Sequence, residues 1–123
     1  NNYGDISLGD AESATLNESC GDIKIKKVNK VIVQNKYGDI VIDNVEYSLQ
    51  IEDNCGDVEI KNINLKEDSY IKNNLGDIKI LNTNEIYFDA KTNLGDTKIN
   101  NNYNKSEITL KIQNDCGDIE INN

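Results

Sequence analysis

The sequence predicts an all-β fold, a parallel β-solenoid of about seven coils, on the basis of three observations. The pair Gly-Asp recurs seven times in the 123 residues, always in the same phase of a longer repeat. Apart from Thr97, apolar residues follow each glycine at the second and fourth positions, as in a strand with one buried face. A second alternating pair precedes the next glycine. Such a repeat is typical of stacked units that cannot bury their apolar faces alone.

The repeated glycines are predicted to form a structural corner between the strand that closes one unit and the strand that opens the next. A positive φ is costly for a residue with a Cβ atom and nearly free for glycine. Gly9 is out of phase and is interpreted as a separate local turn. The corner positions are Gly4, Gly21, Gly38, Gly56, Gly76, Gly95 and Gly117, so the successive differences are 17, 17, 18, 20, 19 and 22 residues.

Each unit is expected to open with a short strand whose inward residues stand two and four positions after the glycine. A third apolar position, seven after the glycine, is occupied by Ala11, Val28, Val45 and Ile63 and weakens to Thr83 and Asn102. Branched residues at alternate positions favour strands. The inward pairs are Ile6/Leu8, Ile23/Ile25, Ile40/Ile42, Val58/Ile60, Ile78/Ile80, Thr97/Ile99 and Ile119/Ile121.

A second strand is expected to close each unit, with inward residues seven and five positions before the next glycine. The chain would then return to its start one layer along, about 4.8 Å away. Length varies most in residues 64–66, 84–85 and 103–106, which are expected to bulge outward as loops. An antiparallel β-sandwich is the competing fold, but it does not need the same residues at one phase of every unit. The closing pairs are Ala14/Leu16, Val31/Val33, Leu49/Ile51, Ser69/Ile71, Phe88/Ala90 and Leu110/Ile112.

The residue just before each glycine is large or apolar and is expected to point inward. Cys20, Cys55 and Cys116 share this position with Tyr3, Tyr37, Leu75 and Leu94. Cys20 and Cys55 would lie two layers apart, about 9.6 Å, which is too far for a disulfide. The three cysteines are therefore interpreted as buried free thiols, and an unpaired set favours a reducing compartment.

The aspartate after each glycine would form a ladder of like charges, in which neighbours repel by about 1 kcal/mol in water. One interpretation is that each carboxylate accepts backbone N–H groups at the corner. The alternative is that the stacked carboxylates bind a column of Ca²⁺ ions. The candidate metal ligands are Asp22, Asp39, Asp57, Asp77 and Asp96, with Asp5 and Asp118 in the same phase.

Composition argues against several functional classes. The net charge of −9 and the absence of arginine disfavour nucleic acid as a partner. Histidine is absent, so histidine-based acid–base catalysis and histidine metal sites are excluded. Every aspartate of the ladder has copies on either side, whereas catalysis needs a distinct site. No catalytic residue and no cofactor is therefore predicted, and no segment is apolar enough to insert in a membrane.

The tandem apolar-Gly-Asp-Ile-x-Ile units, each followed by a Val-x-Val-like strand, resemble a bacterial adhesin-like family of β-strand-repeat domains. That family has long been catalogued as a domain of unknown function and is related to autotransporter-type adhesin head domains. The resemblance runs from Tyr3 to Ile121. It implies a parallel β-solenoid with a cell-envelope or extracellular location, although three unpaired cysteines leave the cytoplasmic face open. It transfers no catalytic or binding residues.

These observations predict a non-enzymatic structural or adhesion-like module of a bacterial cell-envelope protein, with residues 1–123 as one domain of a longer chain. The ligand or cell-surface partner is not identified. An alternative is homo-oligomerisation by end-to-end stacking, because the first unit, Tyr3 to Leu8, and the last, Cys116 to Ile121, share one pattern and carry no obvious cap. A calcium-binding β-roll is the third hypothesis.

Overall fold

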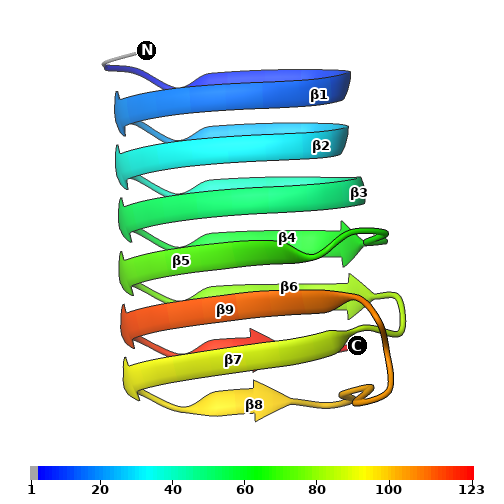
Figure 1. Cartoon of the computed structure of the whole chain (residues 1–123). Coiled ribbons are helices and arrows are strands. Elements are labelled where there is room, and N and C mark those ends of the chain that lie inside the picture. The colour runs from blue at the N-terminus through cyan, green and yellow to red at the C-terminus, as the bar shows by residue number, and fades with distance from the viewer. Residues whose placement is uncertain (1–2) are drawn as a thin grey trace.

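A computed structural model describes residues 3–123, which form β-strands and connecting turns (Figure 1). All strand pairs within these residues are parallel, so the prediction of a parallel β-solenoid is confirmed. The strands are β1 (Ile6–Cys20), β2 (Ile23–Tyr37), β3 (Ile40–Cys55), β4 (Val58–Ile63), β5 (Ser69–Leu75), β6 (Ile78–Thr83), β7 (Tyr87–Leu94), β8 (Thr97–Ile99), β9 (Thr109–Cys116) and β10 (Ile119–Ile121).

Each coil has two walls that meet at a glycine corner. The opening wall follows the glycine and consists of the first halves of β1 to β3 together with β4, β6, β10 and β8. The closing wall precedes the next glycine and consists of the second halves of β1 to β3 together with β5, β9 and β7. Equivalent residues stack in register, as in Ile23 opposite Ile40. The repeat pattern therefore fixes the register between coils.

The order of the coils departs from the order of the chain, which corrects the expectation that each unit stacks on its predecessor. The strand β9 lies between β5 and β7, and β10 lies between β6 and β8. Figure 1 shows the two connections responsible: one leaves β6 for β7, and the other returns from β8 to β9. The return uses residues 100–108, part of the longest repeat unit. The unit Cys116 to Ile121 is thus internal, and β7 with β8 forms the end of the stack.

The end position of β7 and β8 accounts for the weak apolar pattern of that unit. Thr97 is exposed and Ala90 is only partly buried, where inner coils carry fully buried isoleucines such as Ile78 and Ile112. The end coil has a neighbouring coil on one side only, so its other side faces solvent. Polar and small residues there limit the hydrophobic area that the end presents to solvent.

The core is a set of vertical columns of isoleucine, valine and leucine between the walls. The third apolar position is filled as expected by Val28, Val45 and Ile63. The loop at residues 64–68 leaves the strands as predicted, but Leu65 within it is buried. Ile86, in the connection before β7, is also buried. The core therefore includes two loop residues in addition to the strand positions.

Candidate functional site at the glycine edge

The seven corner glycines form a ridge in which successive backbones touch. Their φ angles lie between 110 and 150°. A Cβ atom on Gly56 would lie 2.0 Å from the carbonyl oxygen of Gly38, and one on Gly117 would lie 2.0 Å from that of Gly76. Gly4, in the first coil, would meet nothing within 4 Å. Inner corners therefore need glycine both for its backbone conformation and for the close approach of the next coil.

The aspartates after the glycines form a ladder of hydrogen bonds between coils. The Oδ1 atom of Asp39 accepts the backbone N–H of Asp57 at 2.8 Å, and Oδ1 of Asp77 accepts that of Asp118 at 2.8 Å. The carboxylates do bind backbone N–H groups, but the donor belongs to the neighbouring coil. These charge-assisted bonds offset the repulsion between adjacent carboxylates. The remaining bonds join Asp22 to Asp5, Asp39 to Asp22, Asp77 to Asp57 and Asp96 to Asp118.

The ladder does not bring several acidic side chains around one point. Within residues 3–123, no three His, Cys, Asp or Glu side chains are grouped so that they could hold one metal ion. Each aspartate of the ladder stands in its own coil, and all of them except Asp96 have one oxygen engaged by the next coil. Calcium binding along this ladder stays a prediction.

A largely buried polar column lines the inside of the corner, three positions before Gly21 and before each later corner glycine. The Nδ2 groups of Asn73 and Asn114 donate to the carbonyls of Gly56 and Gly76 at 2.8 and 2.7 Å. The Thr92 hydroxyl donates to the Gly117 carbonyl at 2.8 Å. These side chains satisfy corner carbonyls that point into the protein. Sequence analysis did not identify this role, although the recurrence of asparagine at this spacing carried the signal.

Asp53 occupies the same buried column but cannot donate a hydrogen bond when it is ionised. It is 4 % exposed, and neither of its carboxylate oxygens has a hydrogen-bond partner within residues 3–123. Burial raises the pKa of Asp53 to about 7, although the nearby backbone N–H of Asn54, which does not reach hydrogen-bond geometry, acts in the other direction. The nearby charges of Asp39 and Asp57 raise the pKa further. The neutral carboxyl group is thus the form suited to this column.

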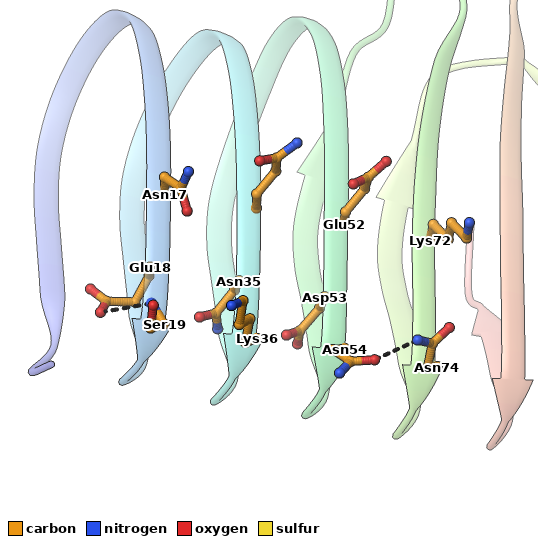
Figure 2. Close-up of a pocket in the computed structure, with 11 residues that line it drawn as sticks. Asn17, Glu18, Ser19, Asn35, Lys36, Glu52, Asp53, Asn54, Lys72 and Asn74 are labelled. Carbon is orange, nitrogen blue, oxygen red and sulfur yellow. Dashed lines mark hydrogen bonds between the residues drawn. The ribbon is translucent and has the colours of Figure 1, made fainter. Parts of the chain in front are cut away.

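A shallow cavity of 480 Å³ lies on the outer face of the closing wall beside this column. Figure 2 shows Glu18, Asn35 and Asp53 pointing to one side of successive strands, while Glu52 and Lys72 point to the other. The lining is polar and mixed in charge. These side chains repeat from coil to coil without a grouped nucleophile and base.

The residues just before the glycines point outward, which overturns the expectation that they are inward and that the cysteines are buried. Tyr3 is 79 % exposed and Leu94 is 70 % exposed, while the three cysteines are partly exposed. The reason is the buried polar column, which fills the inside of the corner. We call these seven residues the edge column. In spatial order they are Tyr3, Cys20, Tyr37, Cys55, Leu75, Cys116 and Leu94.

Large and small side chains alternate strictly along the edge column, an arrangement hidden in the sequence because the last two units exchange places. Cys55 and Cys116 are two coils apart with Leu75 between them, closer than the chain order implied. Cys20 and Cys55 are likewise separated by Tyr37. All three cysteines are free.

A row of mostly uncharged polar side chains flanks the edge column on the closing-wall side. The side-chain amide of Asn74 donates to that of Asn54, and the amide of Asn93 donates to the Asp115 carboxylate at 3.1 Å. We call this the amide row, and its members are Ser19, Lys36, Asn54, Asn74, Asp115 and Asn93. The glycine edge thus consists of three parallel rows: the amide row, the edge column and the aspartate ladder.

Comparison with known proteins identifies the family of this stacked-strand domain. Residues 3–123 contain no helix with the length and hydropathy needed to cross a membrane. The chain has no match among the curated proteins or the solved structures with which it was compared. The model of the Toastrack DUF4097 family, a domain family of unknown function, matches residues 2–123. Because this match spans nearly the whole chain, the protein belongs to the Toastrack DUF4097 family.

Proposed function

We propose that this domain is a non-enzymatic structural module of a bacterial cell-envelope protein, and that it binds a partner through the glycine edge. The observation that carries the proposal is the unbroken edge column, which runs over seven corners with Tyr3, Tyr37, Leu75 and Leu94 exposed. Contiguous exposed apolar residues rimmed by polar ones mark interaction surfaces. The column is about 30 Å long at the spacing of neighbouring strands.

The repetition of the edge supports a structural role over a catalytic one. Each coil presents its edge side chains at the same three positions in the same geometry, so a partner meets a line of equivalent contact positions. The chain has no histidine. A catalytic site requires side chains whose surroundings differ from those of the other residues of the same type, so that their pKa values or reactivity are changed. The edge is built for repeated weak contacts.

An attachment experiment tests this proposal. The domain is displayed on a bacterium that does not normally attach to other cells, and attachment to a cell layer is counted. The variant Tyr37→Ser/Leu75→Ser/Leu94→Ser should lose most of the attachment, because it removes the large side chains of the edge column. The control Ile32→Ser changes an exposed residue away from the edge and should attach normally. Equal attachment by both variants would rule out the glycine edge as the binding surface.

End-to-end stacking is a second candidate function, and the direction of the aspartate ladder favours it. The ladder ends at Asp96, whose carboxylate accepts no N–H from a further coil in the described part of the chain. The opposite end of the ladder is the first coil, in which Asp5 accepts the N–H of Asp22. The stacking ends would be the first coil and β8, since the unit Cys116 to Ile121 is internal. Species larger than a dimer in sedimentation velocity would support this function.

A further inference from the structure

We infer that the partner bound at the glycine edge is a second copy of this domain, in a parallel dimer whose two-fold axis runs along the stack. This inference rests on the proposed function, because it names the occupant of the same edge. In such a dimer every coil lies opposite the same coil of its partner. The spacing of the contacts then matches along the whole edge, since both edges repeat with the same strand separation.

The parallel arrangement sets donors opposite acceptors. A two-fold axis along the stack brings the amide row of one copy against the aspartate ladder of the other. We number the corners in spatial order from Gly4, so that Gly38 is the third corner and Gly56 the fourth. In the third corner the Lys36 ammonium then lies beside the partner's Asp39. In the fourth corner the Asn54 amide lies beside the partner's Asp57. The ladder uses one oxygen of each of these exposed carboxylates and leaves the second as an acceptor. The further matched pairs are Ser19 with Asp22, Asn74 with Asp77, and Asn93 with Asp96.

One corner departs from this pattern of donors opposite acceptors. Asp115 would face the partner's Asp118, although the Asp115 carboxylate already accepts a hydrogen bond from Asn93 in its own chain.

An antiparallel dimer would instead bring the two aspartate ladders against each other. Facing ladders of like charge are repulsive along their whole length. The arrangement of the rows therefore selects the parallel dimer.

The edge column supplies the apolar contact at the centre of the dimer. Large side chains from Tyr3, Tyr37, Leu75 and Leu94 would meet their own copies, and each pair of cysteines would lie between two such contacts. The strip is only one side chain wide, so it buries less surface than most stable dimers. The net charge of −9 on each copy also opposes association. We therefore expect a weak dimer that strengthens as salt screens the charges.

Sedimentation velocity over a range of protein concentrations tests the dimer. The unmodified domain should shift from monomer to dimer as concentration rises, and the shift should begin at lower concentration in raised salt. The edge variant Tyr37→Ser/Leu75→Ser/Leu94→Ser should stay monomeric, while Ile32→Ser should behave like the unmodified domain. A protein that is monomeric under all these conditions, a dimer that survives the edge substitutions, or growth beyond a dimer would overturn the inference.

Cross-linking with a short bismaleimide tests the orientation of the copies. The variant Cys55→Ser/Cys116→Ser keeps only Cys20, in the second corner, and Cys20→Ser/Cys55→Ser keeps only Cys116, in the sixth. In a parallel dimer each remaining thiol faces its own copy, so both variants should cross-link. In an antiparallel dimer centred on the fourth corner, Cys20 lies opposite the partner's Cys116, so neither of these variants should cross-link. Cross-linking only when Cys55 alone is kept would overturn the parallel geometry.

The two proposals fail in different ways. If the domain is monomeric but the edge variant loses cell attachment, the edge binds a different partner and the dimer is wrong. If the domain forms the parallel dimer but the edge variant attaches normally, the dimer stands and cell binding through the edge is wrong. Thermal unfolding of each variant confirms that the fold is kept, as expected for substitutions of exposed side chains.

Discussion

The first coils and the last coils of this domain reach the same geometry by different routes. The strands β1 to β3 stack in the order of the chain, and neighbouring units follow each other directly. Among β6 to β10, a later unit lies between two earlier ones. Even so, the aspartate ladder keeps a bond of 2.8 Å whether its partners are 18 residues apart, as for Asp39 and Asp57, or 41 apart, as for Asp77 and Asp118.

This comparison teaches that the contact surface of a coil, and not its place in the chain, determines which coil it stacks on. Every unit carries the same glycine corner and the same acceptor after it, and all units except the end unit, with Thr97 and Ala90, carry similar apolar walls. Units are then interchangeable as neighbours, and the connections decide the order. Residues 84–86 and 100–108 are the segments that differ between the two regions.

The largest effect is expected from substitutions in the glycine ridge. Gly56→Ala and Gly117→Ala should each lower the free energy of unfolding by more than about 5 kcal/mol. In both cases the new Cβ atom would lie 2.0 Å from a backbone oxygen of the neighbouring coil. Urea unfolding measures the two losses, which should be similar although Gly56 lies in the sequential region and Gly117 in the interleaved one.

Gly9→Ala is the matched control, because Gly9 lies within β1 and not in a local turn as expected, has no positive φ, and would have nothing within 4 Å of an added Cβ atom. Its effect should be small. A much smaller loss at Gly117 than at Gly56 would contradict the equivalence of the two regions, since it would mean that the interleaved coils are more loosely stacked.

An intermediate effect is expected from Asp53, which stands where the interleaved region has Asn114. Burial raises the pKa of the Asp53 carboxyl group from 3.8 to about 7, so the folded protein is more stable when this group is neutral than when it is ionised. The free energy of unfolding should therefore fall as the pH rises from about 4 to about 7 and then level off. Asp53→Asn should remove this loss and stabilise the protein by about 4 kcal/mol at about pH 8, as measured by urea unfolding.

Asn73→Asp provides the reverse test on the neighbouring coil. It exchanges an amide that donates to the Gly56 carbonyl for a carboxylate, so it should make the protein less stable above neutral pH. If Asp53→Asn leaves the pH dependence of unfolding unchanged, Asp53 is ionised in the fold and the column tolerates a buried charge.

The smallest effect is expected in the aspartate ladder. Asp39→Asn and Asp39→Ala both remove the charge, but only asparagine keeps an acceptor for the N–H of Asp57. The asparagine variant should be more stable by about 1 kcal/mol. At Asp96, in the end coil, the same two substitutions should give equal stability. A difference at Asp96 as large as that at Asp39 would show that the inter-coil bond is not its source.

Much of this fold could be predicted from the sequence, because a stacked coil repeats its side chains in one phase. The Gly-Asp pairs located the corners, and the alternating isoleucines located the buried walls. The interleaving could not be predicted, since identical contact surfaces leave neighbours undetermined; the Thr97 unit gave a hint, because polar residues suit an end coil. The prediction that Tyr37 and the cysteines point inward was also wrong. Strict alternation places them inside, but Asn35, Asp53 and their equivalents already fill the corner.

The interleaved stack has a consequence for the time at which the domain is completed in the cell. A ribosome releases the chain from its N-terminus, so β7 and β8 emerge before the strands that will separate them from β5 and β6. The first coils can form during translation, each on the one before it. The remainder must stay open until residues 109–121 have emerged, and that waiting period leaves bare strand edges exposed to other chains.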